Sequence, residues 1–507
     1  MSTARISTRL PRAQGGWTSK LGFVRTSLVA LLVLAAAVLA TAAEAPLRLI
    51  DAVKSGNREA VRALVKQPAA LKVTERDGTT ALHYAVRADD LETMRILLRA
   101  GADATAATRE GITPLQLAAV NGSIAATQVL LEAGANPNAV LPEGETVLMT
   151  AARTGSADVL KALIDHGADL KAREKWYGET ALMWAAAENH VDAIKLLVAR
   201  GADVNERSRA LDVPRRRNGQ SILPLGSWTP AMYAARQGSL EAAMTLASLG
   251  ADLNLTDPDG ATALVLAIIN ANYDVAVALV EKGADPNVAD NEAKMAALYA
   301  TVDMDRLAIG HGRPNPKASG ELAAVDVVKA LLAHGADPNA RLAAPTFQRH
   351  HTGGDRALGE GSTPFMRASK SGDIAVMKLL LAAGADPKLT QPTQANALML
   401  AAGLGWRDGS PAAPAYDQGS EKDAIEAIKL CMESGIDINA TTTNGETALH
   451  SAITGRASVT IVKFLVEHGA DLNAKNKQGR TPLEVAVASR KDVSDIVAYL
   501  KGKTGTN

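Results

Sequence analysis

The sequence predicts an all-α protein, a solenoid in which helix pairs are stacked along one axis. The first observation is a repeat: most intervals between successive marks that read "TAL", "TPL" or a close variant are about 33 residues long, a period typical of solenoids. The second is that every unit presents its turn and helix signals in the same order. The third is that one such helix pair buries a single face, so each unit needs stacked neighbours on both sides. The marks are Thr80, Thr113, Thr146, Thr180, Thr229, Thr262, Ala296, Thr363, Asn396, Thr447 and Thr481.

The chain opens with a segment typical of exported proteins. Residues 1–43 contain five basic side chains and no acid, and they end in the apolar run "TSLVALLVLAAAVLATAA". A basic leader, an apolar middle and small residues at the end predict a secretory signal peptide, with cleavage close to Ala43. The apolar run, Thr26–Ala43, is at the short limit for a membrane span, so an uncleaved anchor facing the periplasm is the alternative. In both cases the repeats are expected in the periplasm or outside the cell.

Residues 44–76 and 478–507 are predicted to cap the stack. The first segment contains "RLIDAVKSGNREAVRALV", which has the pattern of a helix pair without the opening turn of a repeat. The second contains the last repeat and a tail, and it places Lys, Arg and Asp where its outer face would meet water. Polar end units of this kind keep a solenoid soluble.

Each unit between residues 77 and 477 predicts a turn, a helix, a second helix and a loop. A "DG", "EG" or "NG" turn precedes a Thr that suits a helix N-cap, and several units then place Pro at the first helical position. In "LETMRILLRAG" apolar residues recur three and four apart, and the Gly suits a helix C-cap.

These residues resemble the ankyrin repeat, because the pattern "DG-x-TPLH-x-AA … LL-x-x-GADxNA" is nearly complete at 77–109 and 444–477. The resemblance covers roughly residues 47–502 and extends to exported bacterial ankyrin-repeat proteins. It implies about eleven repeats plus an N-terminal cap, hairpin fingers along one edge, and a groove for protein partners. The family His survives only as His83 and His450; Met commonly replaces it, and we expect these Met side chains to pack in the core.

Four insertions interrupt the period, near 206–226, 304–322, 341–359 and 405–421. The first and third each lengthen a finger, and the other two lie between the two helices of a unit. Each adds roughly 16 to 18 residues, and closing such a loop costs only about 1–2 kcal/mol in chain entropy. The second and fourth lie two units apart at the same end of the helices, where we expect them to be close. Two interpretations stay open: the insertions are loops that lengthened without gaining a function, or they form the edges of a binding surface.

The charge of the chain excludes one class of partner. The full sequence carries 54 basic and 54 acidic residues, and removal of residues 1–43 leaves 49 against 54, a net charge of about −5. Nucleic-acid binding requires concentrated positive charge, so none is predicted. The single cysteine, Cys431, replaces a Leu of other units, indicating a core position and no internal disulfide.

Aromatic residues on fingers and insertions are the first candidates for partner binding. Trp176 and Trp228 are predicted at the tips of successive fingers, with Tyr177 beside Trp176, and Trp406 lies in the last insertion. Trp and Tyr bury a large area with little loss of side-chain entropy. Trp184, in contrast, is expected to pack within its helix.

Two variable positions after the "AA" of each first helix are further candidates, because the ankyrin resemblance implies partner contacts there. They are Arg153 with Thr154, Ala187 with Glu188, Arg236 with Gln237, and Lys370 with Ser371. Arg215, Arg216 and Arg217 add a positive cluster beside Trp228, which would suit an acidic protein surface or an anionic polymer. A solvated loop without a partner is the alternative for this cluster.

No catalytic, metal or cofactor site is predicted. His311, His350, His351 and Asp355 lack metal-ligand spacing, and "HTGGDRALGEGS" lacks the Lys of a phosphate-binding loop. Two hypotheses follow. The first is an exported scaffold that binds a protein partner through finger tips, groove and insertions; the alternative is a structural envelope component that binds an anionic polymer or itself.

Overall fold

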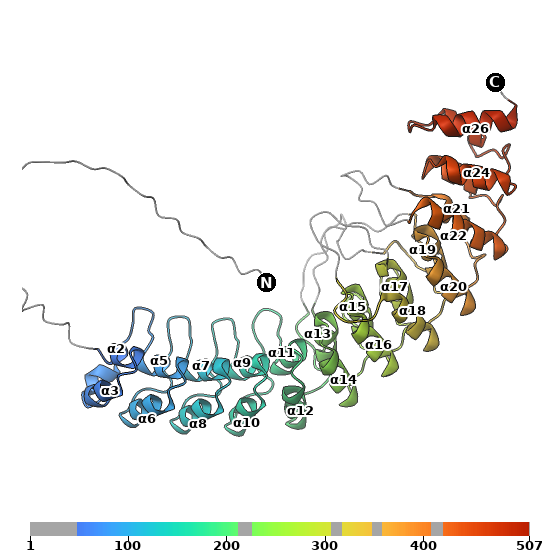
Figure 1. The fold of residues 1–507 in the computed structure, drawn as a ribbon. Helices are drawn as coiled ribbons and strands as arrows, with labels where there is room; N and C mark the ends of the chain where they lie inside the picture. Colours follow the sequence, from blue (N-terminus) through green and yellow to red (C-terminus); the bar gives the residue numbers. More distant parts are fainter. Residues whose placement is uncertain (1–47, 211–225, 306–316, 347–356, 407–418, 506–507) are drawn as a thin grey trace, which may run out of the picture.

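The protein is a curved stack of helix pairs, as predicted. The computed structural model describes residues 48–210, 226–305, 317–346, 357–406 and 419–505. These residues form 25 helices and no strand, apart from four isolated β-bridges. Eleven helix pairs follow an N-terminal group of three helices, and the stack bends into an arc (Figure 1). The prediction of an all-α solenoid is confirmed.

The first helix of each pair lies along the inner side of the arc and the second along the outer side, most clearly from α5 to α20 (Figure 1). We call them inner and outer helices. The inner helices are α5 (Ala81–Arg87), α7 (Pro114–Asn121), α9 (Val147–Thr154), α11 (Ala181–Ala187), α13 (Pro230–Gln237), α15 (Ala263–Ile269), α17 (Ala297–Asp305), α19 (Pro364–Ser371), α21 (Ala397–Ala402), α23 (Ala448–Thr454) and α25 (Pro482–Val487). The outer helices are α6 (Leu91–Arg99), α8 (Ile124–Glu132), α10 (Ala157–Asp165), α12 (Val191–Ala199), α14 (Leu240–Ser248), α16 (Tyr273–Glu281), α18 (Ala324–Ala333), α20 (Ile374–Ala382), α22 (Glu421–Glu433), α24 (Val459–Glu467) and α26 (Ser494–Thr504).

The Thr marks of the sequence begin the inner helices. In most units the Thr hydroxyl accepts a hydrogen bond from the backbone N–H three residues later, as Thr80 does from His83. His83 also links units, because its Nε2 lies 3.0 Å from the carbonyl oxygen of Ile112 in the next finger. Burial lowers the pKa of His83, which favours the neutral ring.

The core consists of small and medium apolar side chains shared between neighbouring units. Met149, Met183, Met232, Met366 and Met399 are buried there, as the sequence predicted. Cys431 is also buried in the core, and burial raises the pKa of its thiol to about 12.

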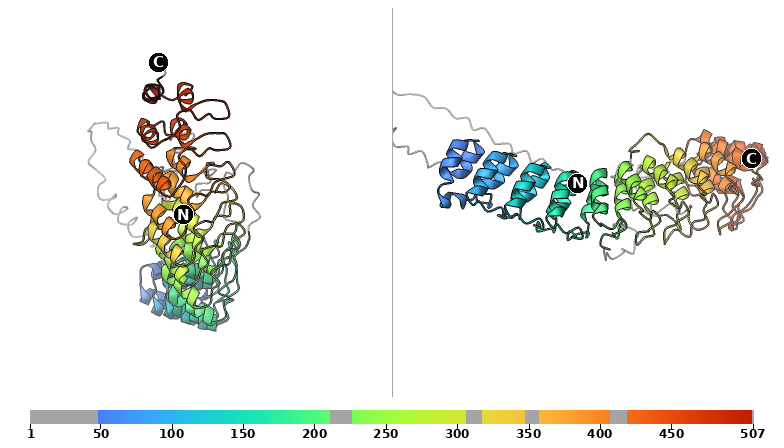
Figure 2. Two further views of the ribbon diagram at one scale, coloured as in Figure 1. Left: turned by 90° about the vertical axis from the view of Figure 1, so that its right-hand side faces the viewer. Right: turned by 90° about the horizontal axis from the view of Figure 1, so that it is seen from below.

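The fingers, which join each outer helix to the next inner helix, lie along one edge of the stack (Figure 2). Hydrogen bonds join neighbouring fingers: the backbone N–H of Arg109 donates to Asp77, and that of Lys175 to Glu143, over 2.7 and 2.8 Å. A second row runs through the Asn that ends most of the "GADxN" motifs and their close variants. The side-chain oxygen of Asn138, for example, accepts from the N–H of Asp169 in the next unit at 2.8 Å.

Three boundaries differ from the sequence prediction. The N-terminal group contains α2 (Leu49–Lys54), α3 (Arg58–Leu64) and a third short helix, α4 (Pro68–Leu71), which begins at a proline. Helix α17 continues to Asp305, into the insertion predicted near 304–322. Helix α22 begins at Glu421, inside the insertion predicted near 405–421, because Ser420 and Asp423 form a capping box.

Among these described helices, none combines the length and the apolar character that a membrane crossing requires. The predicted signal peptide, residues 1–43, lies outside the described residues.

Candidate partner-binding surface

Two positions on each inner helix lie on the face turned to the inner side of the arc, which we call the groove. They are the fourth and seventh residues after the N-cap, three apart and therefore on one helix face. From α5 to α15 the seventh residue is at least partly exposed, whereas the fourth is buried or half-buried. The opposite face packs in the core, as the buried Leu148, Met149 and Ala152 of α9 show. We call the fourth and seventh residues the groove positions. On α9 they are Thr150 and Arg153, and on α11 they are Trp184 and Ala187.

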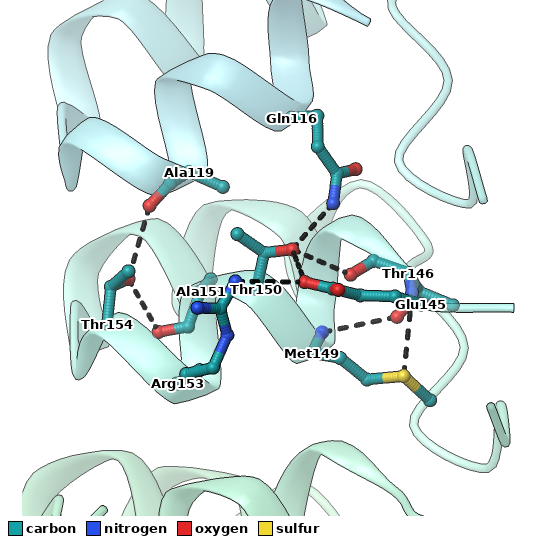
Figure 3. Close-up of polar contacts among 9 residues, drawn as sticks. All are labelled: Gln116, Ala119, Glu145, Thr146, Met149, Thr150, Ala151, Arg153 and Thr154. Atoms are coloured by element: carbon teal, nitrogen blue, oxygen red, sulfur yellow. Dashed lines mark hydrogen bonds and ion pairs between the residues drawn. The ribbon is translucent and has the colours of Figure 1, made fainter. Parts of the chain in front are cut away.

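A chain of polar contacts joins α7 to α9 through the buried side chains of Gln116 and Thr150 (Figure 3). The Gln116 amide donates to the Thr150 hydroxyl, and that hydroxyl donates to Glu145 Oε1, both over 2.6 Å. The Arg153 guanidinium pairs with the same carboxylate oxygen at 3.2 Å. Thr154 donates to the carbonyl oxygen of Ala119 in the preceding unit at 3.1 Å. These contacts hold Arg153 and Thr154, two of the predicted binding residues, in fixed positions while both stay exposed.

Glu179, the residue before the N-cap of α11, places a second carboxylate in the neighbouring part of the groove. It lies near Arg236 of α13, another predicted binding residue, whose positive charge lowers the pKa of the carboxyl. Burial has the larger effect and raises this pKa, and burial together with Glu179 also raises the pKa of Tyr233. Gln237 and Glu188 lie at the ends of α13 and α11, where they are at least partly exposed.

Trp176 and Tyr177 lie at the tip of the α10–α11 finger, with 69% and 50% of their surface exposed. The carboxylate of Glu174 fixes this tip, because it accepts the backbone N–H groups of Trp176 and Tyr177, both at 2.6 Å, and of Glu179 at 3.0 Å. Glu174 itself is buried. Two large apolar side chains are thus presented to solvent on a backbone that is already ordered.

Sequence reasoning missed Glu174, although a signal existed. Asp257 and Asp290 stand at the same point of their fingers, five and six positions before the first-helix mark, and also accept several backbone N–H groups. In the α10–α11 finger a Glu replaces the Asp. The interval between the marks Thr146 and Thr180 is also one residue longer than each of the two intervals before it.

The prediction that Trp228 is exposed at a finger tip is wrong. Trp228 directly precedes the N-cap Thr229, where the chain has returned to the stack, and only 5% of its surface is exposed. Its indole N–H donates to Asp257 at 3.2 Å, and its ring packs edge-on against Tyr233. The guanidinium of Arg236 lies 5.1 Å from the ring centre and covers it from the groove side.

Three other predicted residues are also less exposed than expected. Lys370 and Ser371, at the end of α19, are buried, and the Lys370 ammonium donates to the carbonyl oxygen of Gly405 at 3.3 Å. Trp406 is half-buried, with the Arg456 guanidinium 4.0 Å from its ring centre. Arg215, Arg216 and Arg217 lie outside the described residues.

Chain from two insertions covers the groove around α19. A side chain at Gly405, after α21, would meet Ala357, which follows the long α18–α19 finger. Gln391 donates to the Ala357 carbonyl oxygen at 2.8 Å and fixes this segment. The seventh residues of the inner helices are interior here, unlike those from α5 to α15. Asp303 of α17 and Lys370 of α19 are buried, and Asp303 pairs with the buried Arg367 at 2.6 Å.

The fingers beside the open part of the groove carry exposed Arg and Lys side chains that donate hydrogen bonds to neutral carbonyl oxygens. Arg109 donates to the carbonyl oxygen of Arg76, Lys175 to that of Pro142, and Arg209 to that of Lys175, over 2.6 to 2.7 Å. Carbonyl groups hold these side chains in place without neutralising their charge.

The described part of the chain contains no group of three or more His, Cys, Asp or Glu that could hold a metal ion. The histidines His311, His350 and His351, together with Asp355, lie outside that part.

The fold and this surface define a helical repeat protein of the kind that binds other macromolecules. Models of ankyrin repeats match residues 49–141, 126–208, 215–290, 360–391 and 418–507, more than half of the chain. The chain therefore belongs to the ankyrin repeat family, whose repeats generally mediate protein–protein interaction.

Among solved structures, the human ASB11 ankyrin repeat domain is 24% identical, with a TM-score of 0.39, over 51% of this chain and 98% of that one. No curated protein matches the chain. Ankyrin repeat proteins are typically binding scaffolds without enzymatic activity.

Proposed function

We propose that the protein is an exported scaffold that binds one protein partner through the open groove and finger tips of its N-terminal half. The observation that carries this proposal is the tip of the α10–α11 finger. Trp176 and Tyr177 are exposed, yet the Glu174 carboxylate holds the backbone beneath them. Side chains that are exposed and already ordered lose little entropy when a partner covers them.

Other exposed apolar side chains extend this surface. Val120 lies on the groove side of α7 and Val140 on the α8–α9 finger, and both are more than half exposed. Together with Trp176 and Tyr177 they are four of the six large apolar side chains that stand exposed among the described residues. All four lie between positions 120 and 177, a short part of the whole chain, which favours a single docking site.

The test is capture of partners from an envelope extract by residues 44–507, with a Trp176→Ala/Tyr177→Ala variant alongside. We expect the unchanged chain to retain one protein in stoichiometric amount and the variant to lose it. The matched control is Leu249→Ala/Val487→Ala, which removes two exposed apolar side chains elsewhere and should retain the partner. Retention by all three chains would contradict the proposed surface. Cell-wall or membrane association without a stoichiometric protein would instead favour the structural envelope role.

Export is proposed from residues 1–43 and is tested separately. Mass spectrometry of the protein recovered from cells should show a chain that begins near Glu44, and protease added to cells with a permeabilised outer membrane should digest it. A full-length protein protected with the cytoplasmic markers would contradict export.

A further inference from the structure

The open groove carries a pattern with a period of two repeats. The seventh position after each N-cap alternates between arginine and an apolar residue over six successive units. In order, these residues are Arg87, Val120, Arg153, Ala187, Arg236 and Ile269. All six are at least partly exposed.

Each arginine of this row is held over an aromatic ring. The guanidinium carbon lies 5.6 Å from the Tyr84 ring centre for Arg87, 5.5 Å from that of Trp184 for Arg153, and 5.1 Å from that of Trp228 for Arg236. A guanidinium held over a ring still presents N–H donors at its edge, and carboxylates are bound through those donors, as Glu145 is by Arg153.

The positive charge of the row is only partly neutralised. Arg153 pairs with Glu145, and the charge of Arg236 acts on the nearby carboxyl of Glu179, whereas Arg87 forms no ion pair with any residue that the structure describes. Exposed Lys175 and Arg209, which donate to carbonyl oxygens, add positive charge along the fingers that border the groove. The exposed Glu188 follows Ala187, one of the apolar residues of the row. Its negative charge therefore disfavours a partner carboxylate at that unit.

We infer that the groove recognises an extended acidic polypeptide with carboxylates at a fixed spacing. Neighbouring packed helices lie about 10 Å apart, so arginines on every second unit are about 20 Å apart. An extended chain advances about 3.3 Å per residue, and acidic residues about six apart would therefore meet successive arginines. Small apolar residues between them would lie against Val120, Ala187 and Ile269. This inference rests on the proposed binding function and specifies the partner's chemistry.

The probe is a synthetic peptide of about 15 residues with three glutamates about six residues apart and Ala, Val and Ser between them. A second peptide of identical composition has its glutamates adjacent, and a third carries Gln in place of Glu. Binding to residues 44–507 is measured by fluorescence anisotropy at low and at high salt. We expect the spaced peptide to bind most tightly and salt to weaken its binding.

The groove variant is Arg87→Gln/Arg153→Gln/Arg236→Gln. The spaced peptide should bind it about tenfold more weakly than the unchanged chain, since three exposed charge pairs are lost. The matched control is Arg95→Gln/Arg99→Gln/Lys195→Gln, which removes the same charge from exposed positions on the outer helices α6 and α12 and should bind normally. Circular dichroism of both variants establishes that the stack is intact.

Three outcomes would overturn the inference. They are equal binding of the spaced and adjacent peptides, unchanged binding to the groove variant, and binding of long-chain polyphosphate to the groove in place of any peptide. The last result would assign the arginine row to an anionic polymer. If the partner capture described above succeeds while the spaced peptide fails, the scaffold function stands and only the acidic-peptide specificity falls.

Discussion

The N-terminal units and the units around α19 use the same helix positions in opposite ways. On α9 the groove-facing Arg153 is exposed, and its ion pair with Glu145 is screened by solvent. On α19 the same position is Lys370, which is buried, and on α17 it is Asp303, which pairs with Arg367 of α19, a side chain that is 3% exposed. The difference comes from the insertions, since regular units leave the groove open and chain on both sides of α19 closes it. One fold thus provides a binding surface in one half and a polar interior in the other.

The largest expected effect separates these two ion pairs. Arg367→Ala should lower the free energy of unfolding of its region by about 3–5 kcal/mol, because it leaves Asp303 as an unpaired buried charge. Arg153→Ala should cost no more than about 1 kcal/mol. Urea titration followed by hydrogen exchange of peptides from α17 to α20 measures the first loss, and the same titration with peptides from α9 measures the second. Equal, small losses would show that solvent reaches the α19 groove and would remove the contrast.

The second test compares two tryptophans. Trp228→Ala removes a buried ring and its hydrogen bond to Asp257, and it should destabilise the α13 region by about 3–5 kcal/mol. Trp176→Ala should change stability by about 0.5 kcal/mol or less, because its ring lies in solvent. The same urea and exchange measurements apply, and a comparable loss in the two variants would contradict the assigned positions of these rings.

A smaller effect is expected at the exposed tip. Glu174→Ala removes the acceptor for three backbone N–H groups and should loosen the α10–α11 finger at a cost of about 1–3 kcal/mol. Glu174→Gln keeps one side-chain oxygen acceptor and should fall between the Ala variant and the unchanged chain. Faster hydrogen exchange in residues 174–179 and lower fluorescence anisotropy of Trp176 report the change. Unaltered exchange in the Ala variant would mean that the finger is ordered without this carboxylate.

The smallest effect concerns pH. Burial raises the pKa of Glu206, Glu179 and Asp257, so the folded chain binds more protons than the unfolded chain between the ordinary carboxyl pKa, about 4.3 for Glu, and the raised values. Their contribution to stability is therefore greatest at low pH and is lost as the pH rises through that window. His83 and His450 act oppositely, because burial lowers their pKa and acid favours the unfolded state.

Glu206→Gln isolates one carboxyl from these opposing groups. The difference in unfolding free energy between this variant and the unchanged chain should change as the pH falls from about 7 toward 5, with the unchanged chain gaining stability relative to the variant. Urea titrations at several pH values measure it, and a relative loss of stability by the unchanged chain on acidification would reverse the assigned direction of the pKa shift.

The repeat architecture could be predicted from sequence because its causes are local. Local signals such as Thr80, a "DG" turn and Gly101 each specify a nearby feature of the backbone. Because the sequence repeats, the same feature recurs in most units. The closure of the groove around α19 could not be predicted, since the length of an insertion does not say where its residues lie. For Trp228 the information was present: its place directly before the cap Thr229 puts it at the base of the finger, where Glu145 and Glu179 lie in their own units.

The Asn row has a consequence for how such a chain can evolve and be engineered. The bond from Asp169 to Asn138 spans 31 positions and that from Asp252 to Asn205 spans 47, yet both measure 2.8 Å. Adjacent units therefore recognise anchor residues at the base of a finger and tolerate very different lengths of chain between them. Each long finger is a site where sequence can be exchanged, or a whole reporter domain grafted, while the units on either side keep their register.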